Sequence, residues 1–472
     1  MKRISLLLLI FVAISSIKSV GQNVDSLQIA KLFSTALKDN EGYKVLYQLC
    51  KRAGPRISGS SLSDTAVNMM AKVLNQWGAD TVWLQECMVP KWVRGEKEQA
   101  KIISSTLKMN EVVPVCALGG SIGTSASGLK ANVIEVFAIG ELKNLNPADI
   151  KGKIVFYNGP MPPESIFTFH AYGKTVGQRW ASAIEAARYG AVGVVVRSVA
   201  SHVDSHPHTG SMAYNDTIAK IPSVAISTEG AEKLSAALKK DKNLQFWFKT
   251  SCETHPDVLS HNVIAEIKGS KFPNEVIVVG GHLDAWDMAE GAHDDGAGVV
   301  HSMEVIRLFK VLGIKPQRTI RVVLFMNEEN GTRGAKAYAN WAKTSGEEHI
   351  AAIESDAGGF TPRGFTLDCP EAVKYYLRNK FAPILNYFSV GDFLHNGSGA
   401  DIGYLKDICP LLSGLSPDSQ RYFDYHHAEI DVFEAVNDRE LELGSAAVAS
   451  FVFLLDKYGN GMERTGGGGG NH

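Results

Sequence analysis

The sequence predicts an α/β protein with a mainly parallel central sheet flanked by helices, interrupted by an inserted β-rich domain. Three observations predict this fold class. Helical periodicity fills residues 24–87, and short β-branched runs broken by glycine and proline dominate the middle of the chain. From about residue 260, strands alternate with helices, which is the pattern of a parallel sheet because its crossovers use helices.

Bulk composition narrows the class of protein. The 472 residues are 45% hydrophobic and 21% charged, which is ordinary for a globular chain of one to three domains. A net charge of −2 gives no indication of nucleic acid or an anionic membrane as a partner. The six cysteines are scattered without a CxxC motif, so free thiols and one or two disulfides both remain open.

The amino terminus resembles a secretory signal peptide. Lys2 and Arg3 precede an apolar run, Ile4 to Ile14, which is shorter than the roughly 20 residues of a membrane span. Small and polar residues follow, so we expect cleavage near Gly21 and export to a periplasm or the cell exterior. The rest of the chain has no long apolar run, which predicts a mature protein without a membrane span.

The predicted elements continue in order along the chain. In the insertion, the strands are ANVIEVFAI, KGKIVFYNG, AVGVVVRSV and IPSVAIS, with one helix, RWASAIEAARYG. After it come the strands NVIAEIKG and EVIVVGGH, the helix GAGVVHSMEVIRLFKVLG, and the strands RTIRVVLFMNEE and AAIESDAGG. In parallel sheets of this kind, ligands bind beyond the carboxyl ends of the strands.

Polar clusters follow these strands or enter turns where the sheet should end. The stretch GGHLDAWDMAEGAHDDGAGVV (Gly280–Val300) is the densest, and the clusters together contain His282, Asp284, Asp294, Glu328, Glu329, Asp356 and the pair His426-His427. Taken singly, Asp294 could cap a helix and Glu328-Glu329 could be surface charge. Taken together, imidazoles and carboxylates suit zinc or another first-row divalent ion. A single catalytic zinc needs three protein ligands, so five or more donors indicate two metals.

Four of the segments that contain these clusters also carry a family resemblance. GGHLDAWDMAEGAHDDGAG, NEENGTRGA, ESDAGG and YHHAEID resemble the co-catalytic zinc exopeptidases related to bacterial leucyl aminopeptidases and glutamate carboxypeptidase. The resemblance covers nearly the whole mature chain. It implies the zinc-exopeptidase fold, two zinc ions per subunit and a homodimer.

The resemblance also implies ligand roles. His282 and Asp356 would bind one zinc, and Glu329 and His427 would bind the other. Asp294 would bridge both ions. The Asp294-Asp295 peptide bond is often cis in such proteins.

Three further residues receive roles in catalysis or positioning. Glu328 would be the general base for a water activated by the two zincs, and Asp284 would fix the tautomer of His282. His427 is preferred over His426 as the ligand because an acidic residue, Asp431, follows it by four positions. His426 would then stand where relatives can carry a tyrosine that stabilises the oxyanion.

Two other stretches are candidates for substrate contact. HNGSGADIGYL contains His395 and Ser398 in a Gly-Ser-Gly turn, and an ordinary loop is the alternative there. HVDSHPHTG (His202–Gly210) lies in the insertion and could be a metal site. A loop that leans over the active site is the preferred interpretation, in which His208 touches the substrate.

The expected domain organisation follows from these patterns. Residues 1–21 form the signal peptide, 22–117 and 251–460 form the catalytic domain, and 461–472 form a disordered glycine-rich tail. Residues 118–250 resemble the protease-associated (PA) domain that relatives carry as an insertion.

The predicted function is that of an exported di-zinc exopeptidase acting on dipeptides or short peptides with free termini. An aminopeptidase that acts on longer peptides is the first alternative. A glutaminyl cyclase-like enzyme usually has one zinc, so five ligand positions speak against it. A receptor-like binder that has lost its ligands is also disfavoured, because every motif position still carries a competent residue.

Overall fold

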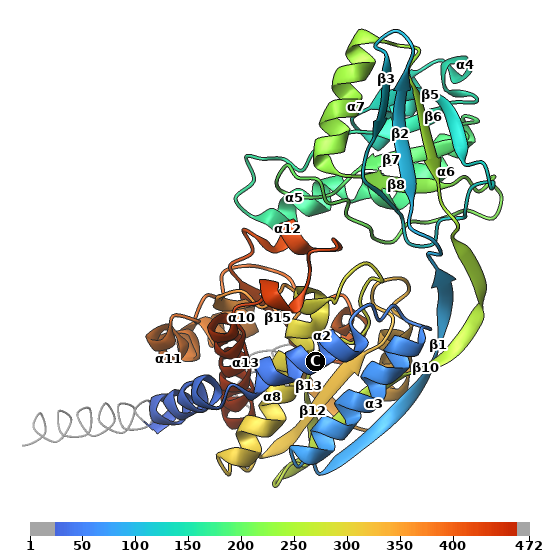
Figure 1. Cartoon of the computed structure of the whole chain (residues 1–472). Helices are drawn as coiled ribbons and strands as arrows, with labels where there is room; N and C mark the ends of the chain where they lie inside the picture. The colour runs from blue at the N-terminus through green and yellow to red at the C-terminus, as the bar shows by residue number, and fades with distance from the viewer. Residues whose placement is uncertain (1–23, 460–472) are drawn as a thin grey trace, which may run out of the picture.

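The computed structural model describes residues 24–459, which form two regions (Figure 1). The first region, residues 24–93 and 253–459, is built on a seven-stranded sheet, and the second region, residues 99–249, is built on an eight-stranded sheet. The predicted signal peptide and glycine-rich tail lie outside the described residues. None of the described helices is long and apolar enough to cross a membrane.

The first sheet has a parallel centre and antiparallel edges, in the order β1-β10-β12-β11-β13-β15-β14. The strands are β1 (Thr81–Val93), β10 (Glu253–Ile267), β11 (Phe272–His282), β12 (Arg318–Phe325), β13 (Glu348–Glu354), β14 (Pro362–Asp368) and β15 (Leu412–Pro417). Strands β12, β11, β13 and β15 run parallel, which confirms the predicted α/β class.

Helices cover both faces of this sheet. One face packs against α2 (Glu41–Ala53), α3 (Ser61–Gln76), α8 (Ala297–Val311) and α13 (Asp438–Tyr458). The other face packs against α9 (Arg333–Ala342) and the short η4 (Ile402–Leu405). The apolar run of β11 divides between the two faces, with Ile277 and Val279 in the first core and Val276 and Val278 in the second. Burial on both faces explains why this strand reads as a continuous apolar run.

Shorter elements complete the first region. They are α10 (Glu371–Lys380), α11 (Ala382–Leu385), η3 (Asn386–Phe388), α12 (Tyr422–Tyr425) and η5 (Phe433–Ala435), with a π-turn, η2 (Ala292–Gly296), before α8. The peptide bond between Asp294 and Asp295 in η2 is cis, as expected. All six cysteines lie in the described part of the chain and are free thiols.

The helical expectation for residues 24–87 is wrong at its end. Gly78, with a φ of +84°, terminates α3, and the chain then enters β1 at Thr81. β1 is rich in valine, tryptophan and other strand formers, and it pairs with β10 along its length. The sequence around β1 does not reveal this pairing, because β10 lies more than 150 residues later in the chain.

The second region contains a mixed sheet in the order β3-β2-β9-β5-β6-β7-β8-β4. Its strands are β2 (Gln99–Ser104), β3 (Met109–Val112), β4 (Val115–Ala117), β5 (Leu129–Val136), β6 (Ile154–Tyr157), β7 (Gly193–Arg197), β8 (Ser223–Ile226) and β9 (Gln245–Lys249). Its helices are η1 (Ile139–Asn144), α4 (Pro147–Ile150), α5 (Thr168–Thr175), α6 (Gly177–Arg188) and α7 (Thr228–Lys240). This sheet begins at Gln99, upstream of residue 118, because the short strands β2 to β4 pair with β9 and β8 rather than with the first sheet.

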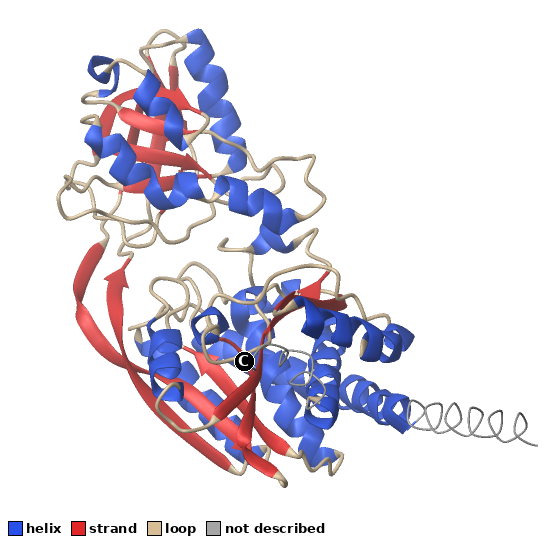
Figure 2. Ribbon diagram, turned by 180° about the vertical axis from the view of Figure 1, so that it is seen from behind, coloured by secondary structure: helices blue, strands red, loops and turns tan. Residues whose placement is uncertain are grey.

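A long, twisted pair of strands connects the two regions. β1 and β10 leave the first sheet together and rise along one side of the molecule toward the second region (Figure 2). The second region also reaches back to the first, where the backbone N–H of Thr209 donates to the carbonyl of His427. The two regions therefore meet at the loops that follow the parallel strands.

Candidate metal centre

Three adjacent parallel strands deliver the predicted ligands to one edge of the first sheet. β11 ends at His282, β12 ends at Phe325 just before Glu328 and Glu329, and β13 ends just before Asp356. Neighbouring parallel strands end at the same edge of a sheet, so the side chains that follow them converge. The structure thus brings together the residues that the sequence placed at strand ends.

The first group of donors surrounds His282. Its Nε2 atom lies 3.1 Å from Asp294 Oδ1 and 3.5 Å from Asp356 Oδ1. Its Nδ1 atom lies 3.0 Å from the backbone carbonyl oxygen of Asp284, which can accept a hydrogen bond from it. This contact leaves Nε2 as the free nitrogen, which faces the carboxylates.

The second group of donors surrounds His427. Its Nε2 atom lies 3.2 Å from Asp294 Oδ2 and 3.1 Å from Glu329 Oε2. Asp294 therefore presents one carboxylate oxygen to each histidine. This is the arrangement expected of a carboxylate shared between two metal positions.

Asp294 is held in place by residues whose roles the sequence reasoning did not find. Asp431 accepts hydrogen bonds from the backbone N–H groups of His293 (2.7 Å) and Asp294 (3.0 Å). Asp295 accepts from the backbone N–H groups of His282 and Gly298, both at 2.9 Å. These carboxylates tie the turn to β11 and α8, and only their closeness to predicted ligands in the sequence hinted at such a task.

The predicted role of Asp284 needs correction. Its carboxylate oxygen lies 3.9 Å from His282 Nδ1, beyond hydrogen-bond reach. It accepts instead from the backbone N–H groups of Asn327 (2.6 Å), Glu328 (3.0 Å) and Glu329 (3.4 Å). The backbone carbonyl of Asp284 orients His282, while its side chain holds the turn that carries Glu328 and Glu329.

The charges of this cluster perturb one another strongly. Burial opposes protonation of both histidines, yet Asp294 and Asp356 raise the pKa of His282 well above its usual value, and Glu329 and Asp294 raise that of His427 to about 10. Burial and the Asp294 charge raise the pKa of Glu329 to about 7. Burial, Asp356 and Glu329 raise the pKa of Glu328 well above its usual value. So many buried carboxylates call for a compensating positive charge.

Unpartnered oxygens show where that charge fits. Asp294 Oδ2, Glu329 Oε1 and Asp356 Oδ1 are buried without a hydrogen-bond partner. The donor atoms of His282, Asp294 and Glu329 all lie within 4.8 Å of one another, as do those of Asp294, His426 and His427. Buried polar atoms normally have partners, so these orphaned oxygens fit cation ligands.

His426 lies beside the centre but farther from its carboxylates than His427. Its ring stacks on that of His427 at 3.6 Å between centroids, and its Nε2 atom lies 3.8 Å from Asp294 Oδ2. Burial and the neighbouring His427 hold the pKa of His426 well below its usual value. The geometry thus favours His427 over His426 as a ligand, and His426 remains a neutral neighbour.

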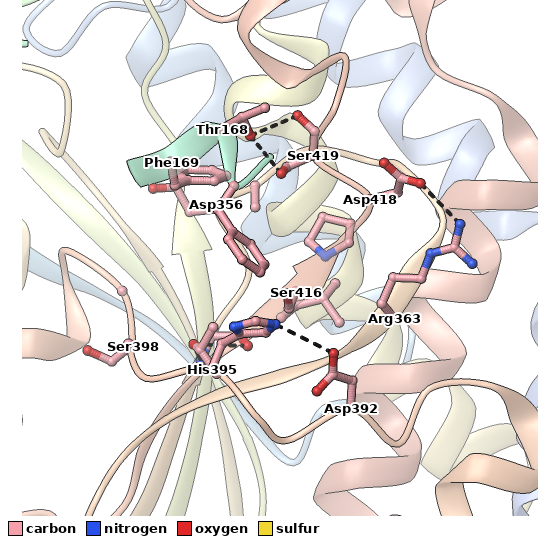
Figure 3. A pocket seen from close by; sticks show the side chains of 18 of the residues that line it. Thr168, Phe169, Asp356, Arg363, Asp392, His395, Ser398, Ser416, Asp418 and Ser419 are labelled. Atoms are coloured by element: carbon pink, nitrogen blue, oxygen red, sulfur yellow. Dashed lines mark hydrogen bonds and ion pairs between the residues drawn. The ribbon is translucent and has the colours of Figure 1, made fainter. Parts of the chain in front are cut away.

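A cavity of about 620 Å³ opens next to Asp356 (Figure 3). His395 and Ser398 line it, as expected of substrate-contacting residues, together with Phe167 and Phe169 from the second region. The His395 ring packs edge-on against Phe167, with centroids 4.8 Å apart. Both regions therefore form the walls of the cavity that adjoins Asp356.

His208 does not line this cavity. It is buried, and its Nδ1 atom lies 2.7 Å from the carbonyl oxygen of His426. Burial lowers its pKa to about 4, so the ring is neutral near pH 7. The loop around it does lean over the metal centre, but the geometry gives no support to the expected substrate contact of His208.

Comparison with known proteins identifies a protein family whose matched segment contains this site. The model of the family described as "Peptidase family M28" matches residues 262–450, which span the candidate ligands. Human carboxypeptidase Q is 35% identical over 415 residues, which cover 88% of this chain and 85% of that protein. The chain belongs to peptidase family M28.

Solved structures agree with this assignment. The M28 peptidase precursor from Shewanella amazonensis superposes with a TM-score of 0.87 at 32% identity, covering 92% of this chain and 97% of its own. BSAP, a zinc aminopeptidase from Bacillus subtilis, shares the fold with a TM-score of 0.62 at 18% identity, over 87% and 94% of the two chains. The present M28 peptidase is therefore a hydrolase of a zinc-dependent family, as the sequence predicted.

Proposed function

We propose that this M28 peptidase is an exported di-zinc exopeptidase that hydrolyses dipeptides and short peptides with free termini. The observation that carries the proposal is the position of Asp294, whose two oxygens face His282 and His427 on opposite sides. His282 and Asp356 would hold one zinc, Glu329 and His427 the other, and Asp294 both. When bound, the zinc ions would supply Lewis acidity that polarises the scissile carbonyl and acidifies water.

Glu328 is the proposed general base. Support for this role comes from its backbone: Glu328 stands beside the proposed ligand Glu329 on a turn whose three backbone N–H groups donate to the Asp284 carboxylate. In the reaction it would take the proton of the attacking water and return it to the leaving amine. Burial and the neighbouring carboxylates of Asp356 and Glu329 raise the pKa of Glu328 above its usual value, which makes its carboxylate a stronger proton acceptor.

The cavity supports a short substrate. It adjoins Asp356 and is bounded on its far side by Phe167 and Phe169 of the second region. A hydrogen-bond contact between Thr168 and Ser419 joins the two regions at its rim (Figure 3). A space enclosed by both regions suits a substrate with a free end better than the middle of a long chain. His395 and Ser398 are the proposed contacts to that substrate.

Three further parts of the proposal concern the whole protein. The second region would be a protease-associated insertion, with its limits moved from 118–250 to about 99–249 by the strands of its sheet. Residues 1–21 would direct export to a periplasm or the cell exterior. The protein would form a homodimer.

An aminopeptidase that accepts longer peptides is the second candidate. The cavity contains the carboxylates of Glu354 and Asp356, while its Arg363 is paired with Asp418 at 3.1 Å. An excess of negative charge suits a free amino terminus better than a carboxylate. Aminopeptidase YwaD of Bacillus subtilis is 24% identical over 303 residues, which cover 64% of this chain and 58% of that protein.

Hydrolysis of a mixed dipeptide library by the mature protein tests the proposal. We expect cleavage with zinc, none with a chelator, and a kcat lower by roughly 10²–10⁴-fold in Glu328→Gln with unchanged zinc content. Glu348→Gln, an exposed carboxylate at the opposite end of β13, is the matched control and should leave kcat unchanged. Activity that survives both chelation and Glu328→Gln would refute the mechanism.

Peptide length and blocking separate the two candidates. Acetylation of the amino terminus should abolish cleavage in either case. Lengthening the peptide should reduce kcat/KM only for a dipeptidase. Rapid release of amino-terminal residues from long peptides would favour the aminopeptidase.

A further inference from the structure

A loop of the second region contacts both ligands of one metal position. The loop is residues 207–212, and most of it is buried. The carbonyl oxygen of Thr209 lies 3.2 Å from Nδ1 of His427, and the N–H of Thr209 donates to the carbonyl of His427 at 3.0 Å. Ser211 Oγ donates to the carbonyl of Glu329 at 2.6 Å. His427 and Glu329 therefore share a support that comes from outside the first region.

The contact to His427 selects one tautomer of its ring. Nε2 faces the carboxylates of Asp294 and Glu329, so it must be the nitrogen that offers a lone pair to a cation. Nδ1 then carries the proton and donates it to the Thr209 carbonyl. Arg179 Nη1 lies 3.3 Å from Nδ1 and 3.4 Å from that same carbonyl. The protonated Nδ1 of His427 and the guanidinium of Arg179 are both donors and cannot bond each other. Both therefore donate to the Thr209 carbonyl.

The loop is itself fixed within the second region. Gly119 N–H donates to the Gly210 carbonyl at 2.9 Å, and Met212 N–H donates to the Gly119 carbonyl at 3.0 Å. Gly210 has a φ of +137°, and a Cβ atom there would lie 2.3 Å from the guanidinium carbon of Arg179. Glycine at this position therefore permits Arg179 to approach the carbonyl that faces His427.

We propose that the 207–212 loop is a positioning arm of the metal centre, which fixes His427 and Glu329 and so couples docking of the second region to metal occupancy. Partners that orient a ligand typically change metal affinity by 10–100-fold when they are removed. The coupling is reciprocal by thermodynamic linkage, so metal binding must also strengthen the docking of the loop. The inference rests on the proposed di-zinc function, but it concerns only one of the two positions.

Zinc affinity measured by competition with a graded chelator tests the arm. Ser211→Ala removes the hydroxyl that bonds the Glu329 carbonyl, and Gly210→Ala displaces Arg179. Ser201→Ala is the matched control, because Ser201 Oγ also joins the two regions, through Asp424 Oδ1 at 2.8 Å, but Asp424 is not a proposed ligand. We expect one of the two zincs to bind roughly 10–100-fold more weakly in the first two variants and both to bind normally in the control.

A second measurement separates positioning from folding. Melting temperatures of the metal-free Ser211→Ala and Ser201→Ala proteins should fall by similar small amounts, since each variant loses one hydrogen bond between the regions. Hydrogen exchange of the 207–212 loop should slow when zinc is added to the wild type, and slow less in Ser211→Ala. If Gly210→Ala does not fold, Ser211→Ala decides.

The outcomes distinguish this inference from the proposed function. A wild type that binds no zinc would remove the proposed function. If the wild type binds two zincs, and Ser211→Ala and Gly210→Ala bind zinc as tightly as Ser201→Ala does, only the positioning-arm proposal is refuted. Equal weakening of both zincs would also overturn it, because the loop contacts the ligands of one position.

Discussion

The two halves of the metal centre are held by different parts of the chain. Within residues 24–459, His282 is oriented by its own region, through the Asp284 carbonyl and the Asp295 carboxylate, and Asp356 follows the end of β13. Glu329 and His427 are also oriented by the second region, through Ser211 and Thr209. One half is complete when the first sheet has folded, whereas the other needs a second folded unit to dock.

This difference indicates how the second region can serve the proposed metal site without supplying any of its proposed ligands. The Ser211 hydroxyl and the Thr209 N–H donate to the backbone carbonyls of Glu329 and His427, so they support these residues without using their side-chain donor atoms. The insertion also supplies Phe167 and Phe169 to the cavity. Substrate space and one metal position can thus change together if the docking of the second region changes.

Removal of the shared ligand should give the largest effect, because it breaks both halves at once. In Asp294→Ala we expect both zincs to be lost and kcat/KM to fall more than about 10³-fold, or roughly 4 kcal/mol of transition-state stabilisation. Asp356→Ala is the comparison variant and should retain the zinc at Glu329 and His427. Zinc content by elemental analysis, with dipeptide kinetics, measures both. Two tightly held zincs in Asp294→Ala would show that the halves do not share this residue.

A substitution at Asp284 should affect only one half of the metal centre, and its effect should be smaller than that of Asp294→Ala. Asp284→Asn removes the charge that holds the turn of Asn327, Glu328 and Glu329, but it keeps the backbone carbonyl that orients His282. We expect roughly 10–100-fold weaker binding of one zinc only. Asp80→Asn is the control, since Asp80 also accepts a backbone N–H, from Lys268, far from the site. Equal weakening of both zincs would mean that the carboxylate supports His282 across 3.9 Å.

Local sequence patterns predicted the positions of His282 and Asp356, the half of the site that the first region orients. Strand–helix alternation placed His282 and Asp356 at strand ends, and the structure brings His282 Nε2 to 3.5 Å from Asp356 Oδ1. Parallel strands oblige their carboxyl ends to meet, so no long-range information was needed. Apolar runs such as that of β12 likewise identified the buried strands.

Contacts between distant segments could not be predicted in the same way. Residues 81–87 were included in the helical stretch, although they begin β1, because their partner strand β10 lies far along the chain. The carboxylate of Asp284 was assigned to its sequence neighbour His282, although it bonds a turn more than 40 residues later. Thr209 and Ser211 carry no catalytic side-chain chemistry, and their importance lies in a backbone carbonyl and one hydroxyl that only docking brings to the ligands.

The smallest expected effect is a loss of stability of the first region at acid pH, which does not involve the 207–212 loop. Burial and the nearby Arg321 lower the pKa of His349 to about 4, so the folded state binds fewer protons than the unfolded state below about pH 6.5. Stability must then fall as the pH falls toward 4. His349→Gln keeps a partner for the Tyr338 hydroxyl, 2.9 Å away, but cannot titrate. In chelated protein we expect its denaturant-measured stability, relative to the wild type, to rise by about 1 kcal/mol from pH 7 to 5.5. A constant difference for His349→Gln would mean that burial does not lower the pKa of this histidine in the folded protein.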